Sequence, residues 1–283
     1  MKKNDDPKSA IDYSQGQKDA AYSVLGEIAN LLADYSDNLR IIGGWVPTLL
    51  YPDKEHIGSI DVDILLNQQK IQKARGYENI RRILTKNGYT KHPDKYFAFV
   101  KRVIIDDVEY AVDVDFLSGK YGGDSGNVSK HIGGIKALPA TAGNFAFEFQ
   151  PQKIKIEYRR PDGAKDFGNI SVISVVPYMV MKAAALGRGK PKDSYDIYCT
   201  ITGYPGGVIA LAEEFLPYAN RTLIREMCEK LSEKFASPDH AGPTDIVTFL
   251  GISETDEIAQ IKQDAYQRIN YLLNSISSMS NVN

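Results

Sequence analysis

Two aspartates, Asp61 and Asp63, lie inside an apolar run that is typical of a β-strand from Ile60 to Leu66. Side chains of a strand alternate between its two faces, so both carboxylates project to one side while Val62 and Ile64 point into the core. Carboxylates held side by side repel each other, and a divalent cation between them relieves the repulsion. The spacing therefore predicts a site for Mg²⁺ or Mn²⁺, against the alternative of two solvated acids at a strand edge or in a turn.

A glycine pair, Gly43-Gly44, follows a predicted strand from Leu39 to Ile42 and precedes a short predicted helix from Val46 to Leu50. Glycines at such a junction let backbone N–H groups come close to a bound phosphate. A tight turn from strand to helix also needs glycine for steric reasons alone. Together with the acids of the following strand, the pair predicts both parts of a nucleotide site, with amides for the phosphates and carboxylates for the metal.

Two further acids, Asp113 and Asp115, lie on one face of a predicted strand in the segment YAVDVDFLSG. Phosphoryl transfer with two metal ions needs a third carboxylate: one ion activates the attacking hydroxyl, and the other neutralises the triphosphate and the leaving pyrophosphate. We favour Asp115 because it precedes the apolar pair Phe116-Leu117, as Asp63 precedes Ile64-Leu65. Asp113 is the substitute, and for either residue the alternative is a solvated strand acid.

The order of Gly43-Gly44, Asp61-x-Asp63 and a later strand acid resembles the nucleotidyltransferase fold of the DNA polymerase β superfamily. The family usually has Ser or Thr after the glycines, whereas this chain has Trp45. A hydroxyl contact to the nucleotide phosphate is therefore missing, and Gly43, Gly44 and Trp45 together form the predicted nucleotide-binding segment.

The later segment MVMKAAALGRGKPKDSYDIYC resembles the AbiEii-type nucleotidyltransferases, the toxins of abortive-infection and toxin–antitoxin systems. Their pattern is a lysine on one helix, a short basic connector, and two aspartates one turn apart at the start of the next helix. The resemblance covers roughly residues 40 to 200. It assigns these roles to Lys182, Lys192, Asp193 and Asp196.

These residues also have a physical interpretation of their own. Asp193 and Asp196 are three residues apart and so share one helical face, and Lys182 comes from the preceding helix. If functional, Lys182 would contact triphosphate oxygens as a compact cation, with Asp196 ordering it or orienting the incoming hydroxyl. Alternatively, Asp193 is only a helix N-cap and Lys182 only extends from an apolar face to water. The basic connector could hold phosphates or be a solvated loop.

The elements that must position these residues fall into two halves. Before residue 170 the patterns predict helices at 17–35, 46–50 and 75–87, strands at 39–42, 60–66, 96–117 (two, turning at Asp106-Asp107) and 153–159, and a loop at 119–144. After Pro177 they predict helices at 177–186, 193–202, 208–216, 221–235, 244–250 and 256–277. We therefore expect an α+β protein: a nucleotidyltransferase domain with a mixed sheet, residues 1–170, then an all-α domain, residues 171–283, with the active site in the cleft between them.

The composition argues against a membrane protein and excludes few other classes of protein. The 283 residues include 34 Lys and Arg against 36 Asp and Glu, so a nucleic-acid contact would need a local basic patch. Apolar residues make up 43% of the chain, which is sufficient for a large core, and no run of 18 apolar residues occurs. Two cysteines, Cys199 and Cys228, lack metal-ligand spacing and are expected to be buried free thiols in a cytoplasmic protein.

The resemblance implies an enzyme that transfers a nucleoside monophosphate from an NTP to an acceptor hydroxyl with Mg²⁺ and releases pyrophosphate. It implies RNA as the acceptor, such as a tRNA 3′ end, growth inhibition or phage defence as the outcome, and a cognate antitoxin as partner. Two alternatives stay open. One is transfer to a small molecule such as an aminoglycoside, and the other, suggested by Trp45, is a catalytically inert nucleotide-binding homologue.

Overall fold

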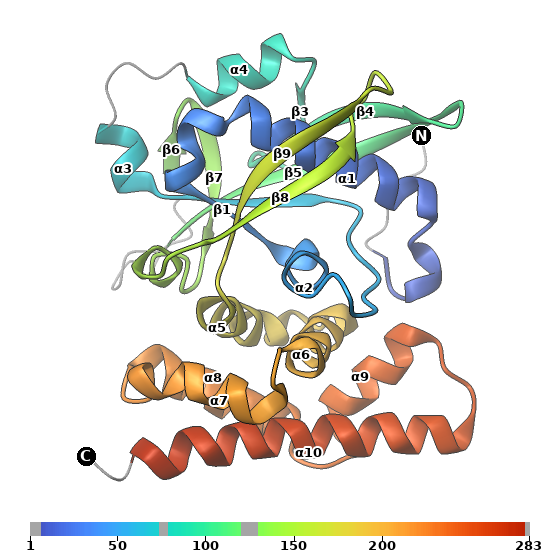
Figure 1. The fold of residues 1–283 in the computed structure, drawn as a ribbon, viewed down its shortest axis with the longest axis vertical. Helices are drawn as coiled ribbons and strands as arrows, with labels where there is room; N and C mark the ends of the chain where they lie inside the picture. Colours follow the sequence, from blue (N-terminus) through green and yellow to red (C-terminus); the bar gives the residue numbers. More distant parts are fainter. Residues whose placement is uncertain (1–6, 74–78, 120–129, 281–283) are drawn as a thin grey trace. The chain divides into compact units, whose positions relative to one another are not determined.

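The structure, a computed structural model, describes residues 7–73, 79–119 and 130–280. It is a mixed α/β fold, which agrees with the expected α+β class (Figure 1). The chain divides into two compact units, whereas the sequence predicts the single stretches 1–170 and 171–283. The sheet unit consists of Ser14–Leu50 and Gly58–Pro177, and the helical unit consists of Met1–Tyr13, Tyr51–Ile57 and Tyr178–Asn283.

In the described residues, nine strands form the sheet of the sheet unit. The main order is β3-β4-β5-β2-β1-β9-β8, and a β6-β7 hairpin joins it where β7 pairs with β5. Strand β1 is antiparallel to β2 and parallel to β9, and β2 is parallel to β5. The strands are β1 (Leu39–Ile42), β2 (Val62–Leu66), β3 (Thr90–Lys91), β4 (Ala98–Ile105), β5 (Val108–Gly119), β6 (Lys130–Ile132), β7 (Ile135–Ala140), β8 (Gln152–Arg159) and β9 (Lys165–Val172).

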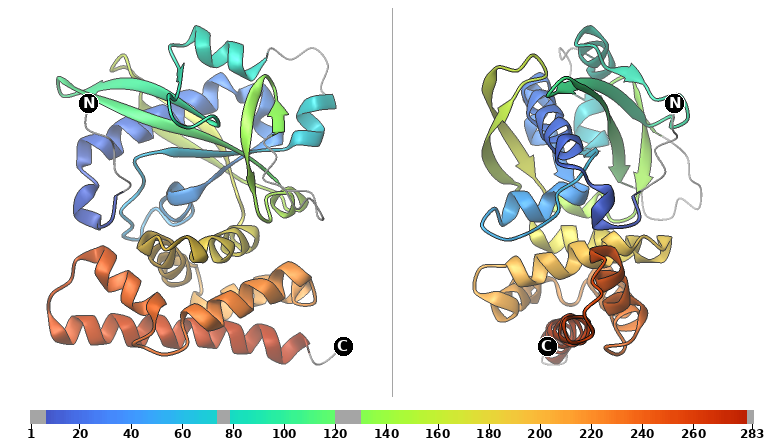
Figure 2. Two further views of the ribbon diagram at one scale, coloured as in Figure 1. Left: turned by 180° about the vertical axis from the view of Figure 1, so that it is seen from behind. Right: turned by 90° about the vertical axis from the view of Figure 1, so that its right-hand side faces the viewer.

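Helix α1 (Gln15–Leu31) lies against this sheet and contacts β4 and β5 as well as β8 and β9 (Figure 2). It begins with a reciprocal cap: the Ser14 hydroxyl accepts from the Gln17 N–H at 3.3 Å, and the Gln17 side chain accepts from the Ser14 N–H at 3.1 Å. Apolar residues spaced three and four apart form its buried face, including Ala20, Ala21, Val24, Leu25 and Ile28. The remaining helices of this unit are α2 (Val46–Leu50), α3 (Gln68–Lys73) and α4 (Ile80–Lys86).

The helical unit is built around two helices that carry most of the packing. Helix α6 packs against α7 and α9, and the long helix α10 packs along α7, α8 and α9. Fully buried apolar residues mark the packed faces, such as Ile197 and Ile201 on α6, Phe249 on α9 and Ile269 on α10. The helices are α5 (Val175–Ala185), α6 (Pro191–Gly203), α7 (Gly207–Phe215), α8 (Thr222–Lys234), α9 (Ala241–Leu250) and α10 (Thr255–Ser280). The first three residues of α5, up to Pro177, belong to the sheet unit.

The predicted hairpin between residues 96 and 117 is confirmed as β4 and β5. Its turn residues Asp106 and Asp107 have φ values of 47° and 63°. A two-residue hairpin turn of the type that matches strand twist requires positive φ at both central positions, and aspartate tolerates it. The predicted strand Leu39–Ile42 and helix Val46–Leu50 are also confirmed, as β1 and α2.

Three predictions about strands were wrong. Residues 120–129 lie outside the described part, but the rest of the expected loop 119–144 includes β6 and β7, which turn at Gly133-Gly134 with φ values of 54° and 79°. Strand β9 was not expected, because its first half, Lys-Asp-Phe-Gly-Asn, is largely polar. Strand β2 begins at Val62, so Asp61 precedes the strand.

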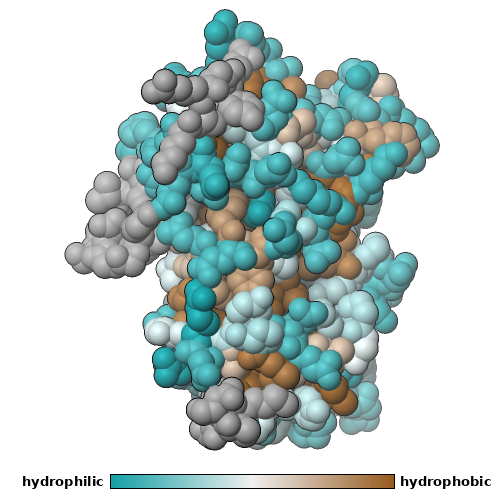
Figure 3. Space-filling model, turned by 60° about the vertical axis from the view of Figure 1, so that its left-hand side comes forward, coloured by the Kyte–Doolittle hydropathy of each residue, from teal (hydrophilic) through white to brown (hydrophobic). Residues whose placement is uncertain are grey.

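The face drawn in Figure 3 is mostly hydrophilic, with smaller hydrophobic areas between. Among large apolar side chains, Ile104, Val108 and Phe167 are about half exposed or more. No helix in the described ranges has both the length and the apolarity needed to cross a membrane. Cys199 and Cys228 are free thiols, as expected, but they are half-buried rather than fully buried.

Candidate functional site

Asp63 and Asp115 are neighbours across the sheet. They are register partners in the parallel pair of β2 and β5, and Asp63 is also the partner of Ile42, the last residue of β1. Partner residues on adjacent strands about 4.8 Å apart point to the same face. Both aspartates are half-buried residues, while Val62 and Val114, on the opposite face, are fully buried. The structure therefore brings these two predicted metal ligands together.

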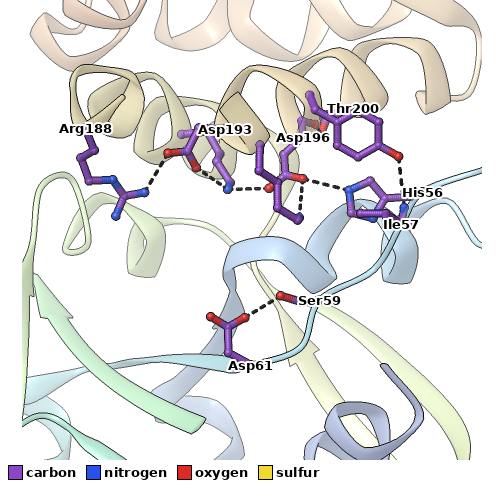
Figure 4. A network of polar contacts seen from close by, with 11 residues as sticks. His56, Ile57, Ser59, Asp61, Arg188, Asp193, Asp196 and Thr200 are labelled. Carbon is purple, nitrogen blue, oxygen red and sulfur yellow. Dashed lines mark hydrogen bonds and ion pairs between the residues drawn. The ribbon is translucent and has the colours of Figure 1, made fainter. Parts of the chain in front are cut away.

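Asp61 is held just before β2 by two hydrogen bonds. The Ser59 hydroxyl donates to Asp61 Oδ1 at 2.5 Å (Figure 4). The Trp45 indole N–H donates to the Asp61 carbonyl oxygen at 2.9 Å, and the Trp45 ring packs on Tyr22 with ring centroids 5.4 Å apart. Trp45 is buried, so in this structure it anchors the backbone at Asp61.

Gly43 lies directly against the carboxylate of Asp63. Its φ of +73° is in the left-handed region, and a Cβ atom at this position would overlap the Asp63 carboxylate group. Gly44 is buried one residue further on, inside the short 3₁₀ helix Gly43–Trp45 that leads into α2. The glycine pair and the first acidic pair are thus parts of one compact arrangement.

Asp113 has a cationic partner that the sequence did not suggest. Lys95, in the loop between β3 and β4, donates from Nζ to Asp113 Oδ2 at 2.7 Å, and His92 Nε2 lies 3.6 Å from the same oxygen. Burial lowers the pKa of Lys95, but the hydrogen bond to Asp113 and the charges of Asp115, Asp113 and Asp61 raise that pKa above its ordinary value. The ammonium of Lys95 therefore lies within electrostatic range of three predicted site acids.

Two of the acids meet the ligand requirement of Mg²⁺ as a class of ion. In the described part of the chain, no group of three or more Asp, Glu, His or Cys side chains gathers closely enough to enclose a metal ion. Mg²⁺, however, is usually held by one or two carboxylates and completes its octahedron with waters and substrate phosphates. Asp63 and Asp115 provide two such carboxylates on neighbouring strands, with Asp61 two residues away from Asp63. Hard oxygen donors of this kind suit Mg²⁺ or Mn²⁺.

The second predicted constellation is a buried ion-pair cluster in the helical unit (Figure 4). Lys182 on α5 donates from Nζ to Asp193 Oδ1 at 2.8 Å and to Asp196 Oδ2 at 2.6 Å, both on α6. Lys182 is 9% exposed and Asp196 is fully buried. Lys192 Nζ donates to Asp196 Oδ1 at 2.7 Å, and Arg188 Nη2 donates to Asp193 Oδ2 at 3.0 Å. The structure thus brings together all four residues assigned by the second resemblance.

Electrostatics keep this cluster ionised. Burial alone would raise the pKa of Asp196, but the cations of Lys182 and Lys192 hold that pKa below its ordinary value. Burial would likewise lower the pKa of Lys182, and the charges of Asp196 and Asp193 raise it well above the ordinary value. Three cations therefore face two carboxylates. Arg188 is the most exposed of the three, at 59% of its side chain, and it is the one best placed to meet an anion from solvent.

Sequence reasoning missed His56, which completes the cluster from the segment Tyr51–Ile57. Its Nε2 lies 2.9 Å from Asp196 Oδ1, and its ring stacks on Tyr195 with centroids 5.2 Å apart. Burial lowers the pKa of His56, so the ring is neutral near pH 7 and Nε2 carries the proton that Asp196 accepts. An isolated histidine in a polar turn gives no local signal of this contact.

No protein-family model and no curated protein matches the sequence. Among solved structures, the chain is similar to the one titled "Crystal structure of JHP933 from Helicobacter pylori". The two are 14% identical, the match covers 95% of this chain and 97% of that chain, and the TM-score is 0.46.

Proposed function

We propose that this protein is a metal-dependent nucleotidyltransferase of the AbiEii type, in the DNA polymerase β superfamily. It transfers a nucleoside monophosphate from an NTP to an acceptor hydroxyl and releases pyrophosphate. The observation that carries the proposal is the register of Asp63 opposite Asp115, with Gly43 against the Asp63 carboxylate. Acids paired across two strands beside a side-chain-free backbone are what a triphosphate and its cation require.

In this proposal Asp61, Asp63 and Asp115 hold the cation, and Gly43 and Gly44 let the phosphates approach the backbone. Mg²⁺ bound by these acids would neutralise the triphosphate and favour departure of pyrophosphate. The register supports Asp115 over its substitute Asp113 as the third acid, since Asp115 is the partner of Asp63 across the two strands. Trp45 supports the site indirectly, through its hydrogen bond to the Asp61 carbonyl.

The proposed role of the helical unit's cluster is to present positive charge to phosphates. Asp193 and Asp196 hold Lys182 and Lys192 charged and ordered, and Asp193 also orients Arg188 at the start of the connector. A contact of Lys182 with triphosphate oxygens stays a prediction from the sequence, and it would require one of its two carboxylate hydrogen bonds to be exchanged. RNA as acceptor, such as a tRNA 3′ end, an antitoxin partner and a cytoplasmic location rest on the sequence resemblance alone.

The test is label transfer by the purified full chain. Each α-labelled NTP is incubated with Mg²⁺ and either total RNA or a panel of aminoglycosides. We expect labelled RNA, and we expect Asp63→Asn and Asp115→Asn each to lower labelling by about 100-fold, since each removes a metal ligand. Their thermal unfolding midpoints should be unchanged or higher, because a repulsion between neighbouring carboxylates is relieved.

The matched control is Glu109→Gln, which removes an exposed acid from the same strand as Asp115 and should leave labelling unchanged. Full labelling by Asp63→Asn would refute the proposed site, and unfolding of both aspartate variants would make the acids structural. Label on a drug instead of RNA would favour the small-molecule enzyme. NTP binding without any label transfer would favour the inert homologue. Trp45, in place of Ser or Thr, was the reason to consider an inert homologue. Its hydrogen bond to the Asp61 carbonyl weakens that reason, because it gives Trp45 a structural role at the site.

A further inference from the structure

The loop between β3 and β4 returns to the sheet beside the site acids. Strand β4 begins at Ala98, whose register partner on β5 is Asp115, and the partner of Asp113 is Val100. The loop that precedes Ala98 therefore carries its side chains to the position where both acids lie. Lys95, three residues before Ala98, is the side chain that reaches Asp113.

His92 fixes the backbone that presents Lys95. The N–H groups of Asp94 and Lys95 both donate to His92 Nδ1 at 3.0 Å, so this nitrogen is an unprotonated acceptor. The ring proton is then on Nε2, which faces Asp113 Oδ2 at 3.6 Å. Lys95 is consequently held in place from two directions: its backbone hydrogen-bonds to His92, and its ammonium pairs with Asp113 at 2.7 Å.

A fixed ammonium at this position changes what the acids can bind. Asp113 is already paired with the ammonium of Lys95, and the same positive charge interacts with Asp115 and Asp61. A second divalent ion bound to Asp113 would have to displace the ammonium that is hydrogen-bonded to this carboxylate at 2.7 Å, or accept its repulsion at close range. Lysine is a compact, strongly hydrated point charge with three donors, and it can supply the neutralising charge that a second ion otherwise supplies.

We propose that Lys95 is a built-in cation of this site, so that the protein takes up one divalent ion with its nucleotide rather than two. The inference rests on the proposed nucleotidyl transfer and deepens it. Lys95 is a positioning residue in this scheme: its charge decides how many metal ions the acids accept. His92 holds it in the required place.

The experiment counts Mn²⁺ ions by electron paramagnetic resonance, with the full chain and saturating α,β-methylene analogues of the four NTPs, which cannot be cleaved at the reacting bond. The same analogue without protein gives the reference for Mn²⁺ bound to nucleotide alone. We expect one Mn²⁺ per protein–nucleotide complex for the natural chain. Lys95→Met should bind a second ion at least about tenfold more tightly than the natural chain does, because Asp113 loses its partner.

Two variants separate charge from structure. Lys95→Arg keeps the positive charge and should bind one ion. Lys91→Met removes an exposed lysine at the end of β3, just before the same loop, and should also bind one ion. Thermal unfolding followed by circular dichroism establishes that each variant is folded.

The outcomes distinguish the inference from the function on which it rests. Two ions in the natural chain, or one ion in a folded Lys95→Met, would overturn the role of Lys95 while leaving nucleotidyl transfer intact. A natural chain that binds neither analogue nor Mn²⁺ would contradict the proposed function itself, and the inference with it. If Lys95→Met does not fold, the count in the natural chain decides: one ion supports the inference and two ions refute it.

Discussion

Two separate features require glycine at position 43, directly after β1. Its φ of +73° is rarely adopted by residues with a Cβ, and a Cβ there would overlap the carboxylate of Asp63. The first reason is a property of the turn, and the second is a property of the site. They can be separated because Gly163 has a φ of +90°, yet a Cβ added there would meet no atom of the described residues within 4 Å.

Gly43→Ala is therefore expected to cost more than Gly163→Ala. The left-handed backbone alone costs about 1 to 2 kcal/mol in each variant. At Gly43 the displaced carboxylate adds to the loss of unfolding free energy and should also abolish label transfer. Urea unfolding with linear extrapolation measures both differences. Equal losses in the two variants, with label transfer retained by Gly43→Ala, would show that the contact with Asp63 has no consequence.

The residues that sequence reasoning missed, Lys95 and His56, share one property. Neither is part of a local sequence pattern, and each meets its aspartate partner only in the folded protein. Lys95 and Asp113 are 18 residues apart, and His56 and Asp196 are 140 apart. Parity along a strand predicts that Asp113 and Asp115 share a face, but it cannot predict which loop covers them. Same-strand and same-helix relations among the site residues were therefore predictable, whereas the partners Lys95 and His56, which come from distant irregular segments, were not.

Among the elements, the segment Tyr51–Ile57 depends on α6 for its placement. His56 bonds to Asp196 and stacks on Tyr195, and the Ile57 N–H donates to the Tyr195 hydroxyl at 3.1 Å. A short irregular segment is thus tied to one helix through adjacent residues of each. Because one of these contacts uses a neutral histidine, the attachment depends on pH.

The sign of that dependence follows from the lowered pKa of His56. Burial is its main cause, the hydrogen bond to Asp196 opposes it, and the nearby cations Lys192 and Lys182 add to it. The unfolded chain binds a proton below about pH 6.5, while the folded protein delays protonation to lower pH. Stability contributed by neutral His56 is therefore fully present above about pH 6.5 and decreases as the pH falls below it.

The measurement is the free energy of unfolding between pH 7 and pH 5. We expect a smaller decrease for His56→Gln, which keeps an N–H donor but cannot titrate, than for the natural chain. His240→Gln, at an exposed position in the same unit, serves as the control and should decrease like the natural chain. Identical pH dependence in all three proteins would mean that His56 does not contribute.

Elements differed in how well the sequence predicted them, for physical reasons. The helices after Pro177 have regular apolar spacing, and their approximate positions are confirmed from α5 to α10. The pairing of strands is non-local, so the parallel pairs of β1 with β9 and of β2 with β5 had no sequence signal. Strand β9 and the β6-β7 hairpin were missed because glycine and polar residues interrupt their apolar pattern.

At the scale of the whole molecule, charge is nearly balanced, with 34 basic and 36 acidic residues. General attraction to a polyanion is therefore small, and the proposed RNA acceptor must be held by a few local cations. Arg188 is the strongest candidate in the helical unit because its side chain is 59% exposed while it is anchored to Asp193. Arg102 on β4 has the same exposure and is anchored to Glu109, which makes it a matched control.

We expect Arg188→Gln to weaken binding of a fluorescent tRNA and to reduce the slope of log affinity against log salt by about one. Arg102→Gln should leave both quantities as in the natural chain. Fluorescence anisotropy over a series of KCl concentrations gives the slopes. Equal slopes for all three proteins would remove Arg188 from the RNA contact, while label transfer would still test the enzyme separately.

The helical unit is assembled from three separate segments of the chain, and this affects the order in which its parts are synthesised. Tyr51–Ile57 leaves the ribosome long before α6, which carries Tyr195 and Asp196. During synthesis His56 cannot form its hydrogen bond with Asp196 until about 140 further residues have emerged, and until then its side chain is solvated. The helical unit thus cannot be completed during synthesis before the whole of the sheet unit, which ends at Pro177, has been made, and a chain arrested before α6 lacks the residues that hold His56.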